Sequence, residues 1–367
     1  MSQFIETHNY IVETISPIHI WSGEKLLPTD YVIHGGSLYA INMDRLIGSL
    51  KDEQAKIFSQ IIQKGDLSMA LGSLNIKPTE YAEYVIPCGF QPGLKLQTHI
   101  KDTEHMPYIP GSSIKGAIRT AICYNLFAIP EKRKGLIQEI FKRSYSEKAE
   151  KEISNFVESI FGSEDGEHSP HYDVMKFLRI SDSKSVNSNF MEVREINVVN
   201  RNRRTGIKIY AEVIKSGLST SGKLTIDKTL YQKTYLEYAD EFPNYKIPTS
   251  IDTITSYVNN FTSSLIDKEI DFARKYNHDS LQKFYLGLKQ NHLEKLNKNQ
   301  FLLRVGWGSG YLAVTLGTLL QSEKQLFERI RRFLPRKFGE PFSPTSRRLI
   351  IQNNTFIPLG WVKITVE

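Results

Sequence analysis

Cysteine is scarce in this chain of 367 residues: only Cys88 and Cys123 occur, and they lie far apart in the sequence. Two isolated thiols form neither a disulfide framework nor a zinc motif, and they suit an intracellular protein. The chain has no apolar run long enough to span a bilayer. Its N-terminus lacks the cationic and apolar regions of a signal peptide. We therefore expect a cytoplasmic protein with no membrane partner.

Catalytic motifs are also missing. The chain contains no HExxH, EF-hand, GxSxG or Walker A pattern, which argues against the common metal, calcium, serine-hydrolase and P-loop sites. Its nine histidines are scattered, and the acidic residues form no metal-binding pattern. We expect no metal and no cofactor, and this inventory favours binding over catalysis.

Positive charge is what the chain has in excess. Lys and Arg number 47 against 40 Asp and Glu, which leaves a net charge of +7. An excess of this sign favours a polyanionic partner such as a nucleic acid. Hydrophobic residues make up 40% and charged residues 24%, as in ordinary globular proteins. The length allows two domains.

Hydrophobic periodicity predicts a mixture of strands and helices. Alternation predicts a strand over residues 10–20, and Gly35-Gly36 marks a hairpin turn within residues 30–41. Helices are expected over residues 43–63, 132–161 and most of 231–298. Further strands are expected in residues 81–100, 177–181, 192–199, 207–214, 348–351 and 360–366, the last two around a turn at Asn353-Asn354.

Residues 108–125, YIPGSSIKGAIRTAICYN, predict a turn followed by a helix with one apolar face. Ser112 and Ser113 are competent N-caps, and Lys115 and Arg119 lie four residues apart on another face. Because a helix N-terminus carries free N–H groups and positive dipole density, a phosphate could bind there. A capped amphipathic helix with solvated cations explains the same pattern and is the commoner case.

A basic connection, NRNRRTG at residues 200–206, joins two of the predicted strands. Arginines gather on and beside it with only Glu195 opposing them: Arg194, Arg201, Arg203 and Arg204. Such a tip projects into solvent, where it either contacts a phosphate backbone or merely aids solubility. Both interpretations stay open on the residues alone.

Glycines at alternate positions, Gly306, Gly308 and Gly310, precede an apolar segment. They let another backbone or a phosphate chain approach closely. The spacing is not a dinucleotide-binding fingerprint, because no parallel-strand context or downstream acidic residue accompanies it.

Four blocks together resemble the RAMP (repeat-associated mysterious protein) superfamily of CRISPR–Cas subunits. Residues 108–122 resemble its Pro-Gly-Ser-Ser-x-Lys-Gly-x-x-Arg element, and residues 304–312, RVGWGSGYL, its glycine-rich loop. Residues 342–349 with 358–361, and the opening segment 15–24, resemble the branch that caps the guide-RNA 3′ side in type III-A (Csm) effector complexes.

The resemblance implies an α+β fold of two ferredoxin-like (RRM-like) modules with helical insertions and a basic β-hairpin thumb. We place the modules at residues 1–235 and 236–367, the first with the thumb and the second with the glycine-rich loop. The implied partners are guide RNA, the backbone subunits of the complex and host ribonucleases that trim the guide. The implied RNA-binding residues are Ser112, Ser113, Lys115, Arg119, Arg194, Arg201, Arg203, Arg204, Gly306, Gly308, Gly310, Arg347 and Arg348.

Two departures concern catalysis. Backbone subunits of these complexes cleave target RNA with an aspartate, but the surroundings of Asp30 lack that pattern. Guide-processing members use a histidine near the N-terminus, and His19 is the only loose counterpart. We therefore predict a non-catalytic RNA-binding and assembly subunit. The alternatives are a metal-independent endoribonuclease with His19 as general base and a scaffold that contacts no RNA.

Overall fold

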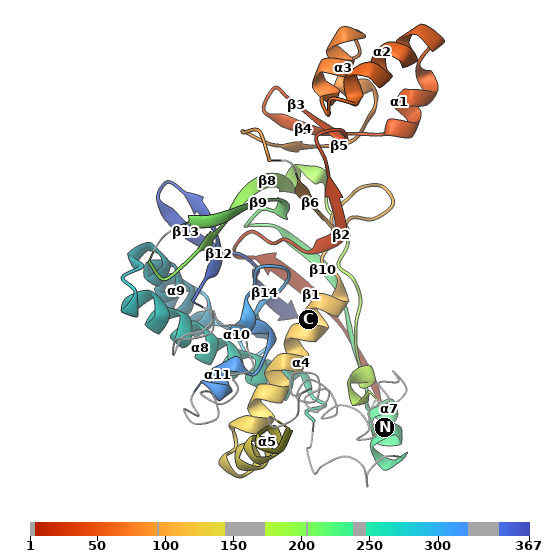
Figure 1. The fold of residues 1–367 in the computed structure, drawn as a ribbon. Helices are drawn as coiled ribbons and strands as arrows, with labels where there is room; N and C mark the ends of the chain where they lie inside the picture. The colour runs from red at the N-terminus through yellow and green to blue at the C-terminus, as the bar shows by residue number, and fades with distance from the viewer. Residues whose placement is uncertain (1–3, 94, 144–172, 203–204, 238–246, 322–344) are drawn as a thin grey trace.

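The computed structural model describes residues 4–93, 95–143, 173–202, 205–237, 247–321 and 345–367 (Figure 1). Three antiparallel or mixed sheets and a set of helices make up this part of the chain. Two large sheets form the body, and a small sheet with three helices extends from it at the top of the view.

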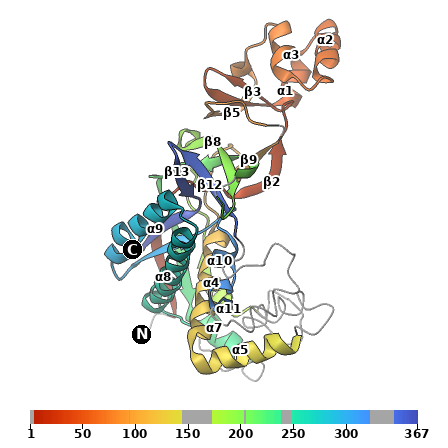
Figure 2. The same ribbon diagram turned by 60° about the vertical axis from the view of Figure 1, so that its left-hand side comes forward.

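The five-stranded sheet has the order β11-β14-β1-β10-β7 and pairs its strands antiparallel throughout. Its strands are β1 (Ile5–Thr14), β7 (Leu178–Ile180), β10 (Ser219–Asp227), β11 (Gln300–Arg304) and β14 (Trp361–Val366). Helices α4 (Gly111–Ala128) and α8 (Ile251–Lys275) lie side by side and cover one of its faces (Figure 2). Tyr10 and Val12 of β1 pack there against Ile118 of α4 and Val258 of α8 in the main core.

The six-stranded sheet has the order β13-β12-β8-β9-β6-β2. Its strands are β2 (Trp21–Leu26), β6 (Leu96–His99), β8 (Met191–Val199), β9 (Thr205–Ile214), β12 (Arg347–Gln352) and β13 (Thr355–Pro358). Among the described strands only β6 and β9 pair parallel. Each of the two large sheets contains strands from before and after residue 235. The predicted domain boundary at that position therefore does not fall between the sheets.

The small sheet, β3-β4-β5, forms an insertion with its own core. It consists of β3 (Tyr31–His34), β4 (Ser37–Ile41), β5 (Ala82–Pro87), α1 (Met43–Ser49), α2 (Asp52–Ile62) and α3 (Leu67–Ser73). The predicted hairpin turn is confirmed, because Gly35 and Gly36 have φ angles of 58° and 75° that suit glycine. The single helix predicted over residues 43–63 is two helices, since the backbone is extended at Leu50.

The remaining α-helices of the described residues are α5 (Pro130–Arg143), α7 (Lys228–Glu237), α9 (Asp279–Asn291), α10 (Tyr311–Val314) and α11 (Gly317–Leu320). The helix predicted over residues 132–161 is present to residue 143, and its later part lies outside the described residues. The turn at Asn353-Asn354 joins β12 to β13, a four-residue strand that periodicity missed, rather than to β14. No helix in the described part of the chain is long and apolar enough to cross a membrane.

Candidate nucleic-acid interface

The glycine-rich loop, residues 305–310, lies against the segment that leads into β2. The Trp307 N–H donates to the His19 carbonyl oxygen at 2.8 Å, and the Val305 N–H donates to the Gly360 carbonyl oxygen at 2.8 Å. A Cβ at Gly306 would lie 2.5 Å from the His19 oxygen, closer than any real contact. Its φ of +81° also favours glycine. The first glycine of the motif therefore allows another backbone to approach.

The outer end of the same loop borders a cavity of about 250 Å³. Gly310 has a φ of +85°, and a Cβ built there would meet no atom within 4 Å. The cavity is lined by Glu269, Arg304, Gly308, Ser309, Gly310, Tyr311, Leu312, Ser346, Arg347 and Arg348. The cavity thus brings together four of the predicted RNA-binding residues: Gly308, Gly310, Arg347 and Arg348.

The wall of this cavity carries more positive than negative charge. Arg304 and Arg347 are 4% and 7% exposed, and both face Glu269, which is 2% exposed. The Arg347 Nε lies 2.8 Å from Glu269 Oε2, and the Arg304 Nη1 lies 3.9 Å from Oε1. Arg304 also donates through Nε to the Leu359 carbonyl oxygen at 3.0 Å. The predicted RNA contact Arg347 is thus a buried member of an ion-paired group.

Sequence reasoning missed Arg304, although a signal existed. It is the single charged residue in FLLRVGWG, the strand that leads directly into the glycine-rich loop. A charged side chain in an apolar strand requires a buried partner, and Glu269 is 35 residues earlier on another element. No local pattern connects the two.

Arg348 differs from its neighbour because it is exposed and points to the opposite face of β12. Its guanidinium carbon lies 4.8 Å from the centre of the Trp307 ring, a cation–π distance. Among the described residues no carboxylate forms an ion pair with it. Arg348 is therefore a charged group available at the surface beside the glycine-rich loop.

The predicted phosphate seat at the start of α4 is occupied by the protein itself. The helix begins at Gly111 with Pro110 before it, so Ser112 and Ser113 lie in the first turn and the predicted serine cap is wrong. The Gly111 N–H donates to Asp182 Oδ1 at 2.8 Å. A carboxylate thus satisfies one of the free N–H groups that a phosphate would use.

The cations of α4 have acidic neighbours as well. Arg119 Nη1 lies 3.1 Å from Asp173 Oδ2, and both side chains are about one-third exposed. Lys115 is half-buried, and this burial lowers its pKa while nearby Asp173 opposes the shift. Lys115 and Arg119 therefore lie beside Asp173, and its carboxylate reduces the net positive charge of this surface.

The basic hairpin forms as predicted from β8 and β9, which pair antiparallel. Arg194 lies 2.8 Å from Glu192 through its Nε, and Lys208 lies 3.1 Å from Glu195. At the tip, a ring nitrogen of His278 lies 3.2 Å from the Arg201 carbonyl oxygen. Arg203 and Arg204 lie outside the described residues.

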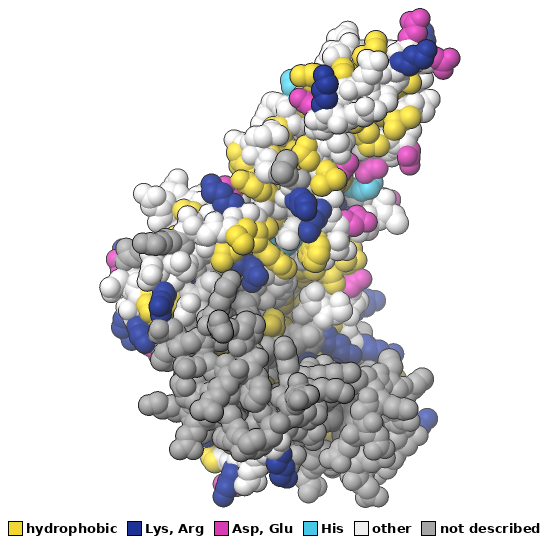
Figure 3. Space-filling view, in the orientation of Figure 1, with side chains coloured by type: hydrophobic (Ala, Val, Ile, Leu, Met, Phe, Trp, Pro, Cys, Tyr) yellow, Lys and Arg dark blue, Asp and Glu magenta, His cyan; other side chains and the backbone are white. Residues whose placement is uncertain are grey.

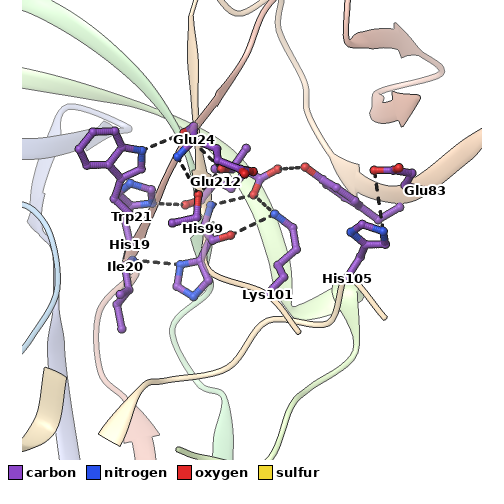
Figure 4. Close-up of polar contacts among 12 residues, drawn as sticks. His19, Ile20, Trp21, Glu24, Glu83, His99, Lys101, His105 and Glu212 are labelled. Carbon is purple, nitrogen blue, oxygen red and sulfur yellow. Dashed lines mark hydrogen bonds and ion pairs between the residues drawn. The ribbon is translucent and has the colours of Figure 1, made fainter. Parts of the chain in front are cut away.

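His19 belongs to a buried polar network below the glycine-rich loop (Figure 4). Its ring is 0% exposed, and Nδ1 donates to the Glu212 carbonyl oxygen at 2.7 Å. Burial lowers the pKa of His19 to about 4. The neutral ring is closed off from solvent, so a substrate hydroxyl cannot reach it in this arrangement.

The centre of the network is the carboxylate of Glu212. It accepts hydrogen bonds from the Tyr84 hydroxyl at 2.6 Å and the His99 N–H at 2.8 Å, and it forms an ion pair with Lys101. Tyr84 comes from β5 of the insertion, whereas His99 and Glu212 come from the six-stranded sheet. The network therefore connects the insertion to the body and has a structural role.

Comparisons with known proteins agree with the resemblance. The model of the RAMP superfamily matches residues 11–313. "CRISPR system Cms protein Csm5" of Methanocaldococcus jannaschii is 26% identical over 96% of this chain and 88% of its own length. The protein of the same name from Mycobacterium tuberculosis CDC 1551 is 21% identical over 62% of this chain and 68% of its own length.

Two solved structures share the fold. A chain of a cryo-EM structure of a Csm–crRNA–target RNA ternary complex in a type III-A CRISPR–Cas system covers 98% of this chain and 100% of its own, with a TM-score of 0.73 and 24% identity. The crystal structure of T. onnurineus Csm5 covers 96% and 99%, with a TM-score of 0.69 and 23% identity. Because the family match spans most of the sequence, the chain belongs to the RAMP superfamily.

Proposed function

We propose that the chain is a guide-RNA-binding and assembly subunit of a type III-A CRISPR effector complex. The observation that carries this proposal is the concave site at the glycine-rich loop, where Gly310 and exposed Arg348 lie beside two buried arginines that share one carboxylate. An open loop with excess positive charge suits a phosphate backbone. The names of the full-length relatives support the same assignment.

Within that complex, the subunit would cap the 3′ side of the guide and support its 3′ maturation. The C-terminal blocks that resemble the cap branch motivate this position, because they include Arg348 in β12 and the Pro358–Trp361 segment beside the glycine-rich loop. Backbone subunits of the complex are the expected neighbours, and host ribonucleases are the expected trimming partners. The expected location is the cytoplasm.

Part of the body has the order of a ferredoxin-like module. Taken in chain order, β14-β1-β10-β7 reads 4-1-3-2, with α4 after the first strand and α8 before the last. This is the order of a βαββαβ unit. The β8–β9 hairpin, inserted between β7 and β10, is our candidate for the thumb. The six-stranded sheet has a different order and a parallel pair, so we assign one such module rather than two.

A non-catalytic role fits the surroundings of His19 better than the endoribonuclease alternative. A general base must reach the proton that it abstracts. His19 is fully buried, and its pKa of about 4 is far from the neutral range in which a general base is most efficient. RNA could reach this ring only after a rearrangement of the residues that cover it.

The test is a gel-shift and cleavage assay with labelled guide RNA in EDTA across a salt series. We expect retarded, intact RNA and affinity that falls steeply with salt, because phosphate contacts release counterions. Changing Arg201, Arg203 and Arg204 together to Ala should make that salt dependence shallower. The charge-matched control changes Arg45, Arg179 and Arg274, which are exposed and lie elsewhere.

Three other outcomes would each contradict part of the proposal. Specific cleavage in EDTA that disappears in His19→Ala would favour the endoribonuclease. An unchanged salt slope in the triple variant would remove the thumb assignment. Absence of any RNA binding by the full chain would favour the scaffold.

A further inference from the structure

Two of the three tryptophans of this chain lie near His19: Trp21, which is exposed, and Trp307, which is partly exposed. The centre of the Trp307 ring is 5.6 Å from that of the His19 ring. Trp21 follows His19 by two residues, and their side chains lie on the same side of the chain (Figure 4). The third, Trp361, is 0% exposed in the core.

Each of these two rings has a cation close to it. Arg348 lies over Trp307 at 4.8 Å, and the Lys25 Nζ lies 5.6 Å from the centre of the Trp21 ring. Neither cation has a carboxylate partner in the part of the chain that the structure describes. This sets them apart from Arg119, Arg194 and Lys208, which all form ion pairs.

Trp21 is 41% exposed on β2, the edge strand of the six-stranded sheet. Its Nε1–H donates to the Glu24 carbonyl oxygen at 2.8 Å, which holds the ring in place without using the Glu24 carboxylate. An indole that is exposed and fixed loses little side-chain entropy when it binds a partner. Trp307 is fixed differently, because its ring packs against the Ile196 and Ile350 cluster.

We propose that Trp307 with Arg348, and Trp21 with Lys25, form two stacking positions for unpaired bases of single-stranded RNA. This inference rests on the proposed function and adds the way in which the RNA is held. Bases stack on indole rings and on guanidinium planes, and nearby cations contact the phosphates. Figure 3 shows Lys and Arg side chains next to hydrophobic ones across the middle of the face in view.

The chemistry predicts preference for single-stranded over duplex RNA and little preference among base sequences. Every base has a face that can stack, whereas bases inside a duplex are already stacked on each other. Stacking on Trp21 and Trp307 would therefore add contacts with bases to the phosphate contacts that we propose for the thumb and for the arginines beside the glycine-rich loop.

Binding of short labelled RNA to the full chain, measured by fluorescence anisotropy across a salt series, tests the proposal. Trp21→Leu should weaken binding of single-stranded RNA about tenfold without changing the salt slope, because it removes stacking but no charge. Arg348→Ala should weaken binding about tenfold and also make the slope shallower.

Two matched controls separate stacking from a general loss of aromatic or charged surface. Phe4→Leu removes another exposed aromatic ring, 55% exposed and next to the first residue of β1. Arg45→Ala removes a guanidinium that lies 5.6 Å from the Tyr81 ring in the insertion, a similar cation–ring pair far from His19. Both should bind RNA as the wild type does.

Tryptophan emission gives an independent readout. Stacking should quench Trp21 and Trp307, whereas Trp361 is buried and should not respond. Trp21→Leu and Trp307→Phe should each remove part of the quenching. Trp307→Phe keeps an aromatic ring in the cluster and should retain most of the affinity.

The outcomes distinguish this proposal from the one on which it rests. RNA binding with no quenching and with wild-type affinity in Trp21→Leu would overturn the stacking positions alone, whereas wild-type affinity in Arg348→Ala would also count against the phosphate site at the glycine-rich loop. Loss of assembly with neighbouring subunits, with RNA binding unchanged, would make the surface a protein interface and also overturn them. Failure of the wild type to bind single-stranded RNA would overturn both proposals.

Discussion

The start of α4 and the glycine-rich loop both carry glycines and cations that suggest a phosphate site, yet the protein uses them differently. At the helix start, Gly111 packs against the Ile180 carbonyl and its N–H is bound by Asp182. In the glycine-rich loop, Gly306 packs against His19, whereas Gly310 opens onto a cavity lined by arginines. A glycine motif therefore indicates close approach, and only the tertiary structure says whether a backbone or a ligand approaches.

The two regions also differ in how far carboxylates neutralise their arginines. Arg119 of α4 has its own partially exposed carboxylate partner, Asp173. At the loop, two buried arginines share one glutamate and Arg348 contacts a ring. The loop side keeps a surplus of positive charge, so we expect it to contribute more to RNA binding.

The largest expected effect is at the loop side, where Glu269 balances Arg304 and Arg347. Glu269→Ala should lower the free energy of unfolding by about 3–5 kcal/mol, because it leaves two buried cations without their carboxylate. Urea unfolding monitored by circular dichroism measures this.

The control for this change is Asp271→Ala on the same helix, which removes an exposed carboxylate 3.1 Å from Arg274. Its expected cost is below about 1 kcal/mol. Equal losses in the two variants would mean that the shared glutamate is not the source of stability at the loop.

The second-largest expected change in stability is at the start of α4. A Cβ at Gly111 would lie 2.1 Å from the Ile180 carbonyl oxygen, a backbone atom that cannot move aside easily. Gly111→Ala should therefore destabilise the protein by about 3 kcal/mol. Thermal and urea unfolding measure it.

Gly116→Ala tests the same substitution on the same helix, at an exposed position where a Cβ meets no atom within 4 Å. It should stabilise the protein by up to about 1 kcal/mol, because Ala favours the helix. If Gly111→Ala also leaves stability unchanged, the contact between Gly111 and residues 180–182 is looser than in the structure, and the helix start is open to a ligand.

The smallest of the three effects depends on pH and concerns His19 beneath the loop. Burial lowers its pKa from 6.5 to about 4, so between these values the unfolded chain binds a proton that the folded chain does not. The contribution of neutral His19 to stability is therefore fully present above pH 6.5, its pKa in the unfolded chain, and is lost as the pH falls towards about 4. At about pH 5 the loss from His19 should be about 2 kcal/mol.

Replacing the titrating ring tests this assignment. In His19→Asn, the amide can still donate to the Glu212 carbonyl oxygen, and the loss of stability from about pH 7 to about pH 5 should shrink by about 2 kcal/mol. Buried His99, whose pKa also lies well below its ordinary value, retains its own contribution of the same sign. An unchanged pH profile in the variant would assign the whole acid sensitivity to other groups.

Much of the fold followed from local patterns. The apolar face of α4, the Gly35-Gly36 turn and the strands of the basic hairpin all agree with prediction, because each depends on neighbours in the sequence. The serine cap of α4 was wrong because Asp182, 71 residues away, binds the Gly111 N–H and the chain enters through Pro110. The strand β13 was missed because four residues are too few for a clear period.

The sequence by itself determined the family, the positions of the turns and the residues that any RNA site would draw on. These properties depend on short motifs and on the conformational preferences of single residues. Only the tertiary structure decided which arginines are neutralised and which remain available. Arg347 meets Glu269 across 78 residues of sequence, while the next residue, Arg348, turns to the other face of the strand and meets Trp307. Because side chains alternate along β12, Arg347 and Arg348 point to opposite faces of the strand. Their partners Glu269 and Trp307 come from distant parts of the sequence, and only folding brings them to these faces.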